Sequence, residues 1–335
     1  MKPFRILALD GGGVRGAFGA AFLSEIEHRL GRSIVGDFDL VAGTSTGAIT
    51  AASMAFGMSA NDVVEFYRKH VPNIFHPREP HEPRGWMKPV FPAARTIFRR
   101  RTGGRFDDFF RSRYCPHALR HSFEDAFGDA TLQELKSASL IVPAVNLSIG
   151  RSYVFRTPHL QDHQQDRDVM VADLLRAATA APTYFPHMVM PDGHAYCDGG
   201  LWANNPGILA VAEAIKIRRE CVGPTCDPAF DVSTIQILSI GTGTTTYSLL
   251  PPGSDAGILY WSQHVADVMG MSQAQGTEIP LEYLLGDRYH QVNFELPDES
   301  WALDGIEHTE RLFELGKEQA AREFSVIEQQ FFLQG

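Results

Sequence analysis

The stretch Val41-Ala-Gly-Thr-Ser-Thr-Gly-Ala48 decides the fold, because an apolar run meets a glycine-flanked serine and then a helix of small residues. Its centre, Gly43-Thr-Ser45-Thr-Gly47, has the G-x-S-x-G pattern of a sharp strand-to-helix turn. The serine backbone of such a turn is strained, and the two glycines let the strand and the helix approach closely. The hydroxyl then projects beside the N–H groups that begin the helix. The pattern predicts a nucleophile at Ser45, although it also suits an ordinary turn.

On either side of this turn, buried strands alternate with amphipathic helices. Apolar runs predict strands at residues 4–9, 38–42, 140–146 and 235–240, and residues 196–200 are expected to form a turn. Apolar periodicity predicts helices at residues 16–30, 46–56, 61–70, 116–127, 171–178, 206–219, 258–269 and 306–330, with Pro72 ending the third. This alternation indicates an α/β fold with a mostly parallel central sheet and helices on both faces.

The chain is expected to form one domain. We place its core at about residues 4–244, a proline-punctuated, lid-like insertion at about 77–114, and a helical C-terminal extension at about 256–335. The apolar tail at residues 329–334 is expected to pack on the body or on a second copy of the chain. The second of these alternatives would make the protein a homo-oligomer, and both stay open.

Composition favours a globular protein of the cytoplasm. The hydrophobic fraction is 44% and the charged fraction 21%, and the net charge of −10 argues against binding to DNA or RNA polymers. We find neither a signal peptide nor an apolar run that could span a bilayer, so any membrane contact is expected to be peripheral. His117 and His121, and likewise His159 and His163, have i,i+4 spacing without an evident third ligand, so neither a metal nor another cofactor is expected.

A glycine-rich loop, Asp10-Gly-Gly-Gly-Val-Arg-Gly16, follows the first expected strand. Loops at the carboxyl ends of neighbouring strands share one crevice in an α/β sheet, so this loop is expected beside the elbow serine. The N–H groups of Gly11, Gly12 and Gly13 suit either a bound phosphate or the oxyanion of an acyl-transfer reaction, and the neighbouring serine favours the oxyanion. Arg15 has three open roles: shaping the loop by pairing with a carboxylate, orienting the donors, or meeting a substrate phosphate.

A serine hydroxyl attacks an ester only when a neighbouring base removes its proton. A third loop holds Asp198 in an Asp-Gly-Gly stretch, and this carboxylate can act directly on Ser45 in a two-residue arrangement. Histidine is the commoner base, and His187 and His194 are the nearest candidates, but both also suit turn or surface positions. Asp198 also suits a purely structural role, because Asp-Gly pairs are common in turns. The base is expected at Asp198, with His187 kept as an alternative.

The three motifs, in this order, resemble the patatin-like phospholipase family. The resemblance covers about residues 4–244, and three further segments are similar to family segments at matching places: Ala181-Pro-Thr-Tyr-Phe-Pro186, Asn204-Asn-Pro206 and Leu238-Ser-Ile-Gly-Thr-Gly243. It implies a three-layer α/β/α fold, and a serine esterase of the phospholipase A type that releases free fatty acid from membrane phospholipid through an acyl-enzyme.

The resemblance also assigns roles to residues. Ser45 would be the nucleophile and Asp198 the base of a Ser-Asp dyad, in a family that needs no metal. Gly12, Gly13 and neighbouring N–H groups, ordered by Arg15, would form the oxyanion hole. The chain departs from the family at one point, because members often have a second proline where this sequence has His187.

The insertion is basic in a chain that is acidic overall. Between residues 84 and 113, arginine and lysine outnumber the acids and alternate with aromatic residues, and the candidate ligand-binding residues are Arg99, Arg100, Arg101 and Arg105. Arginine forks bind phosphate, and aromatic rings enter lipid interfaces. Three interpretations stay open: a solvated basic loop, a surface that docks on anionic lipid headgroups, and a site for an anionic regulatory ligand.

The regulatory interpretation rests on the family resemblance. Some bacterial patatin-like phospholipases are effectors of antiphage systems and are activated by cyclic di- or trinucleotides, and the size of this chain looks like theirs. Two rival classes are a nucleotide-binding switch that uses the glycine-rich loop as a phosphate site and a catalytically silent interaction module. The loop lacks the lysine of a P-loop, G-x-x-x-x-G-K-[ST], which weighs against the first rival.

Overall fold

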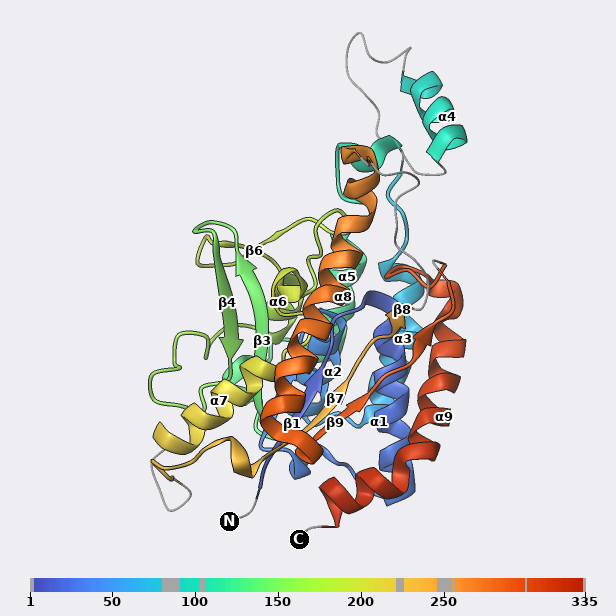
Figure 1. Ribbon diagram of the computed structural model, residues 1–335. Helices are drawn as coiled ribbons and strands as arrows, with labels where there is room; N and C mark the ends of the chain where they lie inside the picture. Colours follow the sequence, from blue (N-terminus) through green and yellow to red (C-terminus); the bar gives the residue numbers. More distant parts are fainter. Residues whose placement is uncertain are drawn as a thin grey trace.

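The computed structural model describes residues 3–79, 91–102, 106–220, 226–245, 255, 257–298 and 300–333. Within these residues the fold is built on an eight-stranded sheet. Figure 1 shows its arrangement. The strand order is β5-β6-β3-β2-β1-β7-β9, with β4 also paired to β3. These strands are β1 (Phe4–Leu9), β2 (Leu40–Gly43), β3 (Ser139–Asn146), β4 (Arg151–Arg156), β5 (Met188–Val189), β6 (Ala195–Asp198), β7 (Ile235–Ile240) and β9 (Tyr289–Val292). Two short strands, β8 (Thr244–Thr245) and β10 (Glu295–Leu296), pair separately.

The middle of the sheet is parallel and one side of it is antiparallel. β1 pairs in parallel with β2 and β7, β2 pairs in parallel with β3, and β7 with β9. β3 pairs antiparallel with β4 and β6, and β5 pairs antiparallel with β6. The mostly parallel central sheet predicted from the sequence is therefore confirmed. The turn predicted at residues 196–200 is wrong, because residues up to Asp198 form β6 and only Gly199–Leu201 turn away as a short 3₁₀ helix.

The pairing of β3 brings the carboxyl ends of β2 and β6 together. Ile141 of β3 pairs with both β4 and Ala42 of β2, whereas Ala144 pairs with both β4 and Asp198 of β6. Because β4 occupies one side of β3 at both positions, β2 and β6 share the other side. β2 runs parallel to β3 and β6 runs antiparallel to it, so the two strands point at each other. Residues that end or follow these strands are thus placed face to face.

Helices cover both faces of the sheet (Figure 1). Their bounds are α1 (Gly16–Leu30), α2 (Thr46–Phe56), α3 (Ala60–Ile74), α4 (Phe91–Thr102), α5 (Pro116–Phe127), α6 (Val171–Ala178), α7 (Gly207–Glu220), α8 (Ile258–Leu285) and α9 (Thr309–Ile327). In β1, Leu7 and Leu9 enter the larger core with α1, α2, α3, α5, α6 and α9, while Ile6 and Ala8 enter the smaller core with α7 and the end of α8. The predicted three-layer α/β/α architecture is confirmed.

Two helices are longer than the sequence suggested. α3 does not end at Pro72 but continues to Ile74, because Val71 and Ile74 extend its buried stripe into the core. α8 runs through Pro280 to Leu285, where Leu281 and Leu285 are buried against the sheet. Burial of apolar side chains offsets the cost of proline inside a helix in both cases. Among the described helices, none combines the length and apolar character needed to cross a bilayer.

The insertion is more regular than expected. It contains α4 and a 3₁₀ turn at Phe106–Phe109, and Figure 1 shows α4 standing away from the sheet, beyond one end of α8. Arg95 Nη2 of α4 lies 2.7 Å from Asp107 Oδ1, and the rings of Phe91 and Phe106 meet edge to face with centroids 5.2 Å apart. These contacts let an arginine-rich segment form a helix outside the main core.

Candidate active site

Ser45 occupies a strained turn between β2 and α2. Its φ and ψ are +52° and −118°, in the positive-φ region that residues other than glycine seldom adopt. The flanking glycines are required by close approach, because a Cβ on Gly43 would lie 2.3 Å from the carbonyl oxygen of Gly47, and a Cβ on Gly47 would lie 2.2 Å from that of Leu9. The predicted elbow geometry is present, and it holds the half-buried serine at the carboxyl edge of the sheet.

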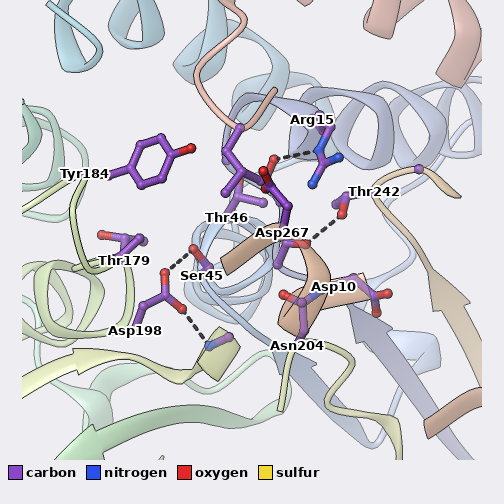
Figure 2. Close-up of a pocket in the computed structure, with 18 of the residues that line it drawn as sticks. Asp10, Arg15, Ser45, Thr46, Thr179, Tyr184, Asp198, Asn204, Thr242 and Asp267 are labelled. Atoms are coloured by element: carbon purple, nitrogen blue, oxygen red, sulfur yellow. Dashed lines mark hydrogen bonds between the residues drawn. The ribbon is translucent and has the colours of Figure 1, made fainter. Parts of the chain in front are cut away.

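Asp198 meets Ser45 across this edge (Figure 2). Ser45 Oγ donates to Asp198 Oδ2 over 2.5 Å, a length typical of a hydroxyl bonded to a carboxylate. The N–H of Gly200 donates to Asp198 Oδ1 over 2.8 Å, so both carboxylate oxygens are held. The proximity of Ser45 and Asp198 expected from the sequence is therefore present in the structure.

The environment of Asp198 adjusts its basicity. The side chain is buried, and this burial raises the pKa of the carboxyl group to about 6, against the opposing effect of the hydrogen bonds from Ser45 and Gly200. At neutral pH the group is still mostly ionised. A carboxylate with a pKa near the working pH is a better proton acceptor than an ordinary surface aspartate.

The glycine-rich loop lies beside the serine, and its donors are not equivalent. The N–H of Gly11, which the sequence predicts as an oxyanion donor, is already paired in the structure, because it donates to the carbonyl oxygen of Asn204 over 3.0 Å. This bond is possible because the loop runs directly against the Asn204 backbone. In the described part of the chain, the N–H groups of Gly12 and Gly13 donate to no protein acceptor, and both residues line the Ser45 pocket. These two N–H groups are the candidate oxyanion hole.

Arg15 braces the same loop. Its Nε donates to the carbonyl oxygen of Gly12 over 3.2 Å, and Figure 2 shows its side chain near Asp267 of α8. Burial raises the pKa of Asp267, and the charge of Arg15 opposes that rise. Of the three roles considered for Arg15, orienting the loop has the most direct geometric support.

Sequence reasoning missed three residues that shape this loop. Thr242 Oγ1 donates to the carbonyl oxygen of Gly11 over 2.6 Å, Asn204 supplies the acceptor for the Gly11 N–H, and the carbonyl oxygen of Leu303 accepts from the Val14 N–H over 2.9 Å. The segments around Asn204 and Thr242 resembled the family, but the sequence alone gave no partner for either. Leu303 carried no recognisable pattern.

The histidine alternative has no geometric support. His187 is exposed beside β5, and His194 Nδ1 lies 3.3 Å from the side-chain amide of Asn146. Within the described residues, the hydrogen-bond partner of Ser45 Oγ is the carboxylate of Asp198 and not a histidine. We therefore keep Asp198 as the candidate base.

A cavity extends from Ser45 into an apolar region between helices. Apolar side chains of α2, α3 and α5 line it, together with Phe185, and these are Ile49, Phe66, Val71, Ile74 and Leu119. The same cavity is also lined by polar groups, which come from the glycine-rich loop, from Asn204 and from α8 residues such as Asp267 and Glu278. The serine thus lies where an apolar chain and a polar group of one substrate would meet.

The basic candidates of the insertion are not part of this cavity. Arg99 and Arg100 are exposed on α4 and do not line the Ser45 pocket. Arg101 belongs to the same helix, and Arg105 lies outside the described residues. Arg99 and Arg100 are thus open to a separate anionic partner, but the structure does not bring them to the serine.

A histidine and glutamate cluster lies elsewhere. His159 Nε2 and His163 Nδ1 lie 2.9 Å and 3.2 Å from Glu213 Oε1. Glu213 of α7 is therefore a third residue that could ligate a metal, and the sequence did not reveal it. Two cations already contact the cluster: Arg156 Nε lies 3.1 Å from Glu213 Oε1, and Lys216 Nζ lies 2.9 Å from His163 Nε2. Arg156 thus pairs with the Glu213 carboxylate and Lys216 contacts His163, and we assign no metal here.

Comparison with known proteins identifies the family. The family model for patatin-like phospholipases matches residues 7–211. The chain is 35% identical over 256 residues to a cGAMP-activated phospholipase of Vibrio cholerae, an alignment that covers 74% of this chain and 66% of the relative. It is 30% identical over 302 residues to a cGAMP-activated phospholipase of Pseudomonas aeruginosa (90% and 81% covered), and 29% identical over 249 residues to a cUMP-AMP-activated phospholipase of Escherichia coli (71% and 64% covered).

The chain therefore belongs to the patatin-like phospholipase family. It spans about two thirds of the length of the Vibrio cholerae relative and about four fifths of that from Pseudomonas aeruginosa. The matched region contains Ser45, Asp198 and the glycine-rich loop, which are the residues that the structure gathers around one cavity.

Proposed function

We propose that the protein hydrolyses acyl ester bonds of membrane phospholipids through a Ser45-Asp198 dyad, and that a cyclic nucleotide activates it. The observation that carries the proposal is the 2.5 Å hydrogen bond between Ser45 Oγ and Asp198 Oδ2 at the mouth of an apolar cavity. Membership of the patatin-like phospholipase family supports the reaction class.

In the first half of the reaction, Asp198 accepts the Ser45 proton as Oγ attacks the ester carbonyl carbon. The carbonyl oxygen becomes an oxyanion, which the N–H groups of Gly12 and Gly13 stabilise. The tetrahedral intermediate then collapses, the ester C–O bond breaks, and Asp198 returns its proton to the leaving alcohol. The lysophospholipid departs, and the acyl group stays on Ser45.

In the second half, the carboxylate of Asp198 takes a proton from a water molecule that attacks the acyl-enzyme. The same two N–H groups stabilise the second oxyanion. Collapse breaks the bond between the acyl carbon and Ser45 Oγ, and the proton held by Asp198 returns to that oxygen. The products are free fatty acid and regenerated enzyme, and the sequence of steps balances without a metal ion.

The cavity accounts for a lipid substrate. Its apolar region, lined by Ile49, Val71 and Leu119, suits an acyl chain, whereas the polar region beside Asp267 suits the glycerol and headgroup. Because phospholipids reside in bilayers, we place the active enzyme at the inner membrane by peripheral contact from the cytoplasm. The exposed Arg99 and Arg100 of α4 are suitable partners for anionic headgroups.

The proposed control by a nucleotide rests on the relatives. Two of them are cGAMP-activated phospholipases and one is a cUMP-AMP-activated phospholipase. Because this chain belongs to the same family, the proposal gives it an activator of the same class and a role in antiphage defence. We do not assign the nucleotide to particular residues.

Hydrolysis of defined lipid vesicles tests both parts of the proposal. Wild-type protein and Ser45→Ala are incubated with phosphatidylethanolamine and phosphatidylglycerol vesicles, with and without cGAMP or cUMP-AMP, and fatty acid release is measured by mass spectrometry. We expect release from the wild type only, and more of it with one of the nucleotides. Equal release by Ser45→Ala would overturn the dyad, and full release without nucleotide would overturn the control.

A further inference from the structure

We propose that Asp304 is a positioning residue, which holds the oxyanion donors in place by connecting them to the end of the insertion. The inference rests on the proposed hydrolase function, because it concerns the same glycine-rich loop. We name residues 106–114, through which the insertion rejoins the core, the return segment. Three consecutive contacts make this connection: from the loop to Leu303, from Asp304 to the return segment, and from that segment to the wall of the cavity.

The first contact joins the glycine-rich loop to Leu303. The Val14 N–H donates to the Leu303 carbonyl oxygen over 2.9 Å. A Cβ on Gly13 would lie 2.1 Å from the same oxygen, and the φ of Gly13 is +59°, a conformation that favours glycine. The position of the Leu303 carbonyl therefore determines how the Gly13 peptide is placed, and with it one of the two candidate donors.

The second contact joins the next residue to the return segment. Asp304 Oδ2 accepts from Arg113 Nη1 over 2.6 Å and from the hydroxyl of Tyr114. The Asp304 side chain is only 13% exposed, so solvent weakens this ion pair little. The Gly305 N–H also bonds to the Ala302 carbonyl oxygen over 3.0 Å, and this turn holds the backbone of Leu303 and Asp304 together.

The third contact fixes Arg113 against the cavity wall. Its N–H donates to the Thr183 carbonyl oxygen over 2.8 Å, and its guanidinium lies 5.0 Å from the centre of the Tyr184 ring. Nε also donates to Asp108 over 3.2 Å, which ties it to the 3₁₀ turn of the insertion. Tyr184 lines the Ser45 cavity. One arginine thus connects the insertion, the cavity wall and, through Asp304, the oxyanion donors.

The consequence is that a displacement of the return segment changes the geometry of Gly12 and Gly13 without touching Ser45 or Asp198. Such a displacement lowers the rate of the chemical step, because donors must lie close to the position of the developing oxyanion. Ile49 and Val71 of the apolar region are not among the contacts named above, so we expect the effect on kcat to exceed the effect on KM.

The substitution Asp304→Asn tests the positioning role. We expect kcat on a p-nitrophenyl ester to fall about 10- to 100-fold with a smaller change in KM, which is the size of effect that a displaced catalytic group produces. Asp173→Asn is the matched control, because Asp173 pairs with Arg176 over 2.9 Å, has a similar exposure of 12%, and does not line the cavity. The control is expected to keep wild-type kcat.

Titration with a fluorophosphonate separates positioning from general stability. Its amplitude counts competent sites, whereas its rate constant reports the chemistry at each site. An unchanged amplitude with a slower rate constant for Asp304→Asn supports the inference. A reduced amplitude with a wild-type rate constant shows a structural role only and overturns it. Tyr114→Phe is a milder variant, because it removes only the Tyr114 hydroxyl that donates to Asp304. We expect it to slow the rate constant by a smaller factor.

A double-mutant cycle tests whether the ion pair itself is responsible. If Arg113 and Asp304 act as a pair, the variant with both residues changed to alanine loses no more kcat than either single variant. Losses that multiply overturn the inference. All measurements include cGAMP or cUMP-AMP. Absence of wild-type labelling under every condition contradicts the proposed function, whereas normal labelling of both wild type and Asp304→Asn contradicts the positioning role alone.

Discussion

Ser45 Oγ lies 2.5 Å from Asp198 Oδ2, although 153 positions separate the two residues in the chain. The contact exists because β2 and β6 lie on the same side of β3 and run toward each other. The elbow turns the serine out of the end of β2, and β6 ends at the aspartate. The contact between Ser45 and Asp198 is thus set by the sheet, and the helices around it supply the cavity.

Replacing the base removes activity but not the fold. We expect Asp198→Asn to lower the rate of ester hydrolysis by about 10²- to 10⁴-fold, the usual contribution of a general base. The melting temperature at pH 7.5 is expected not to fall, because burial raises the pKa of this carboxyl group, which means that its ionised form is disfavoured in the fold. Wild-type turnover by the variant, with circular dichroism showing a native fold, would contradict its role.

The activity is expected to depend on pH through the same carboxylate. Asp198 must be ionised to accept a proton, and burial raises its pKa to about 6. The value of kcat/KM should therefore rise about tenfold per pH unit below pH 6 and then become constant. The measurement is a pH profile with a neutral ester, with circular dichroism at each pH. A midpoint near the ordinary aspartate pKa of about 4 would show that burial does not raise the pKa of the controlling carboxyl group.

The elbow is expected to tolerate no side chain at Gly47. A Cβ there would lie 2.2 Å and 2.7 Å from the carbonyl oxygens of Leu9 and Asp10, which are backbone atoms that cannot rotate away. Gly47→Ala should destabilise the protein by about 1–3 kcal/mol, measured by chemical denaturation. Gly36→Ala is the control, because a Cβ at Gly36 meets no atom within 4 Å. Equal stability of the two variants would refute the close packing described here.

The apolar region of the cavity is expected to select acyl-chain length. Val71 of α3 lines it, so Val71→Phe should lower kcat/KM for long-chain esters about tenfold and affect short-chain esters less. A series of p-nitrophenyl esters measures this. Val326→Phe makes the same change on α9, at a side chain that is 55% exposed, and should leave the profile unchanged. A uniform loss at all chain lengths in Val71→Phe would place the acyl chain elsewhere.

The sequence predicted the local parts of the site well. The glycine pattern around Ser45 requires a tight turn because of steric limits on neighbouring backbone, and these limits act within a few residues. The apolar periodicity of α2, α5 and α6 likewise depends on local spacing, and their predicted bounds match the structure. Physical constraints that are local in the chain can be recognised in one sequence.

The rest depended on contacts between distant segments. The acceptor of the Gly11 N–H is the backbone of Asn204, and a backbone carbonyl has no sequence signature. Asp198 approaches on an antiparallel strand, whereas its Asp-Gly-Gly stretch suggested a turn. Asp304 lies in a segment without a motif, and only the fold brings it to Arg113. Tertiary pairing decided these positions, and a single sequence does not encode it in a readable pattern.

The central claim is that Ser45 is a nucleophile activated by Asp198, and covalent labelling tests it most directly. Wild-type protein and Asp198→Asn are treated with a fluorophosphonate in the presence of cGAMP or cUMP-AMP, and the adduct is located by peptide mass spectrometry. We predict one adduct on the peptide that contains Ser45 in the wild type, formed at least about 100-fold more slowly in Asp198→Asn. An adduct on another residue, or equal labelling of Ser45 in both proteins, would contradict the account.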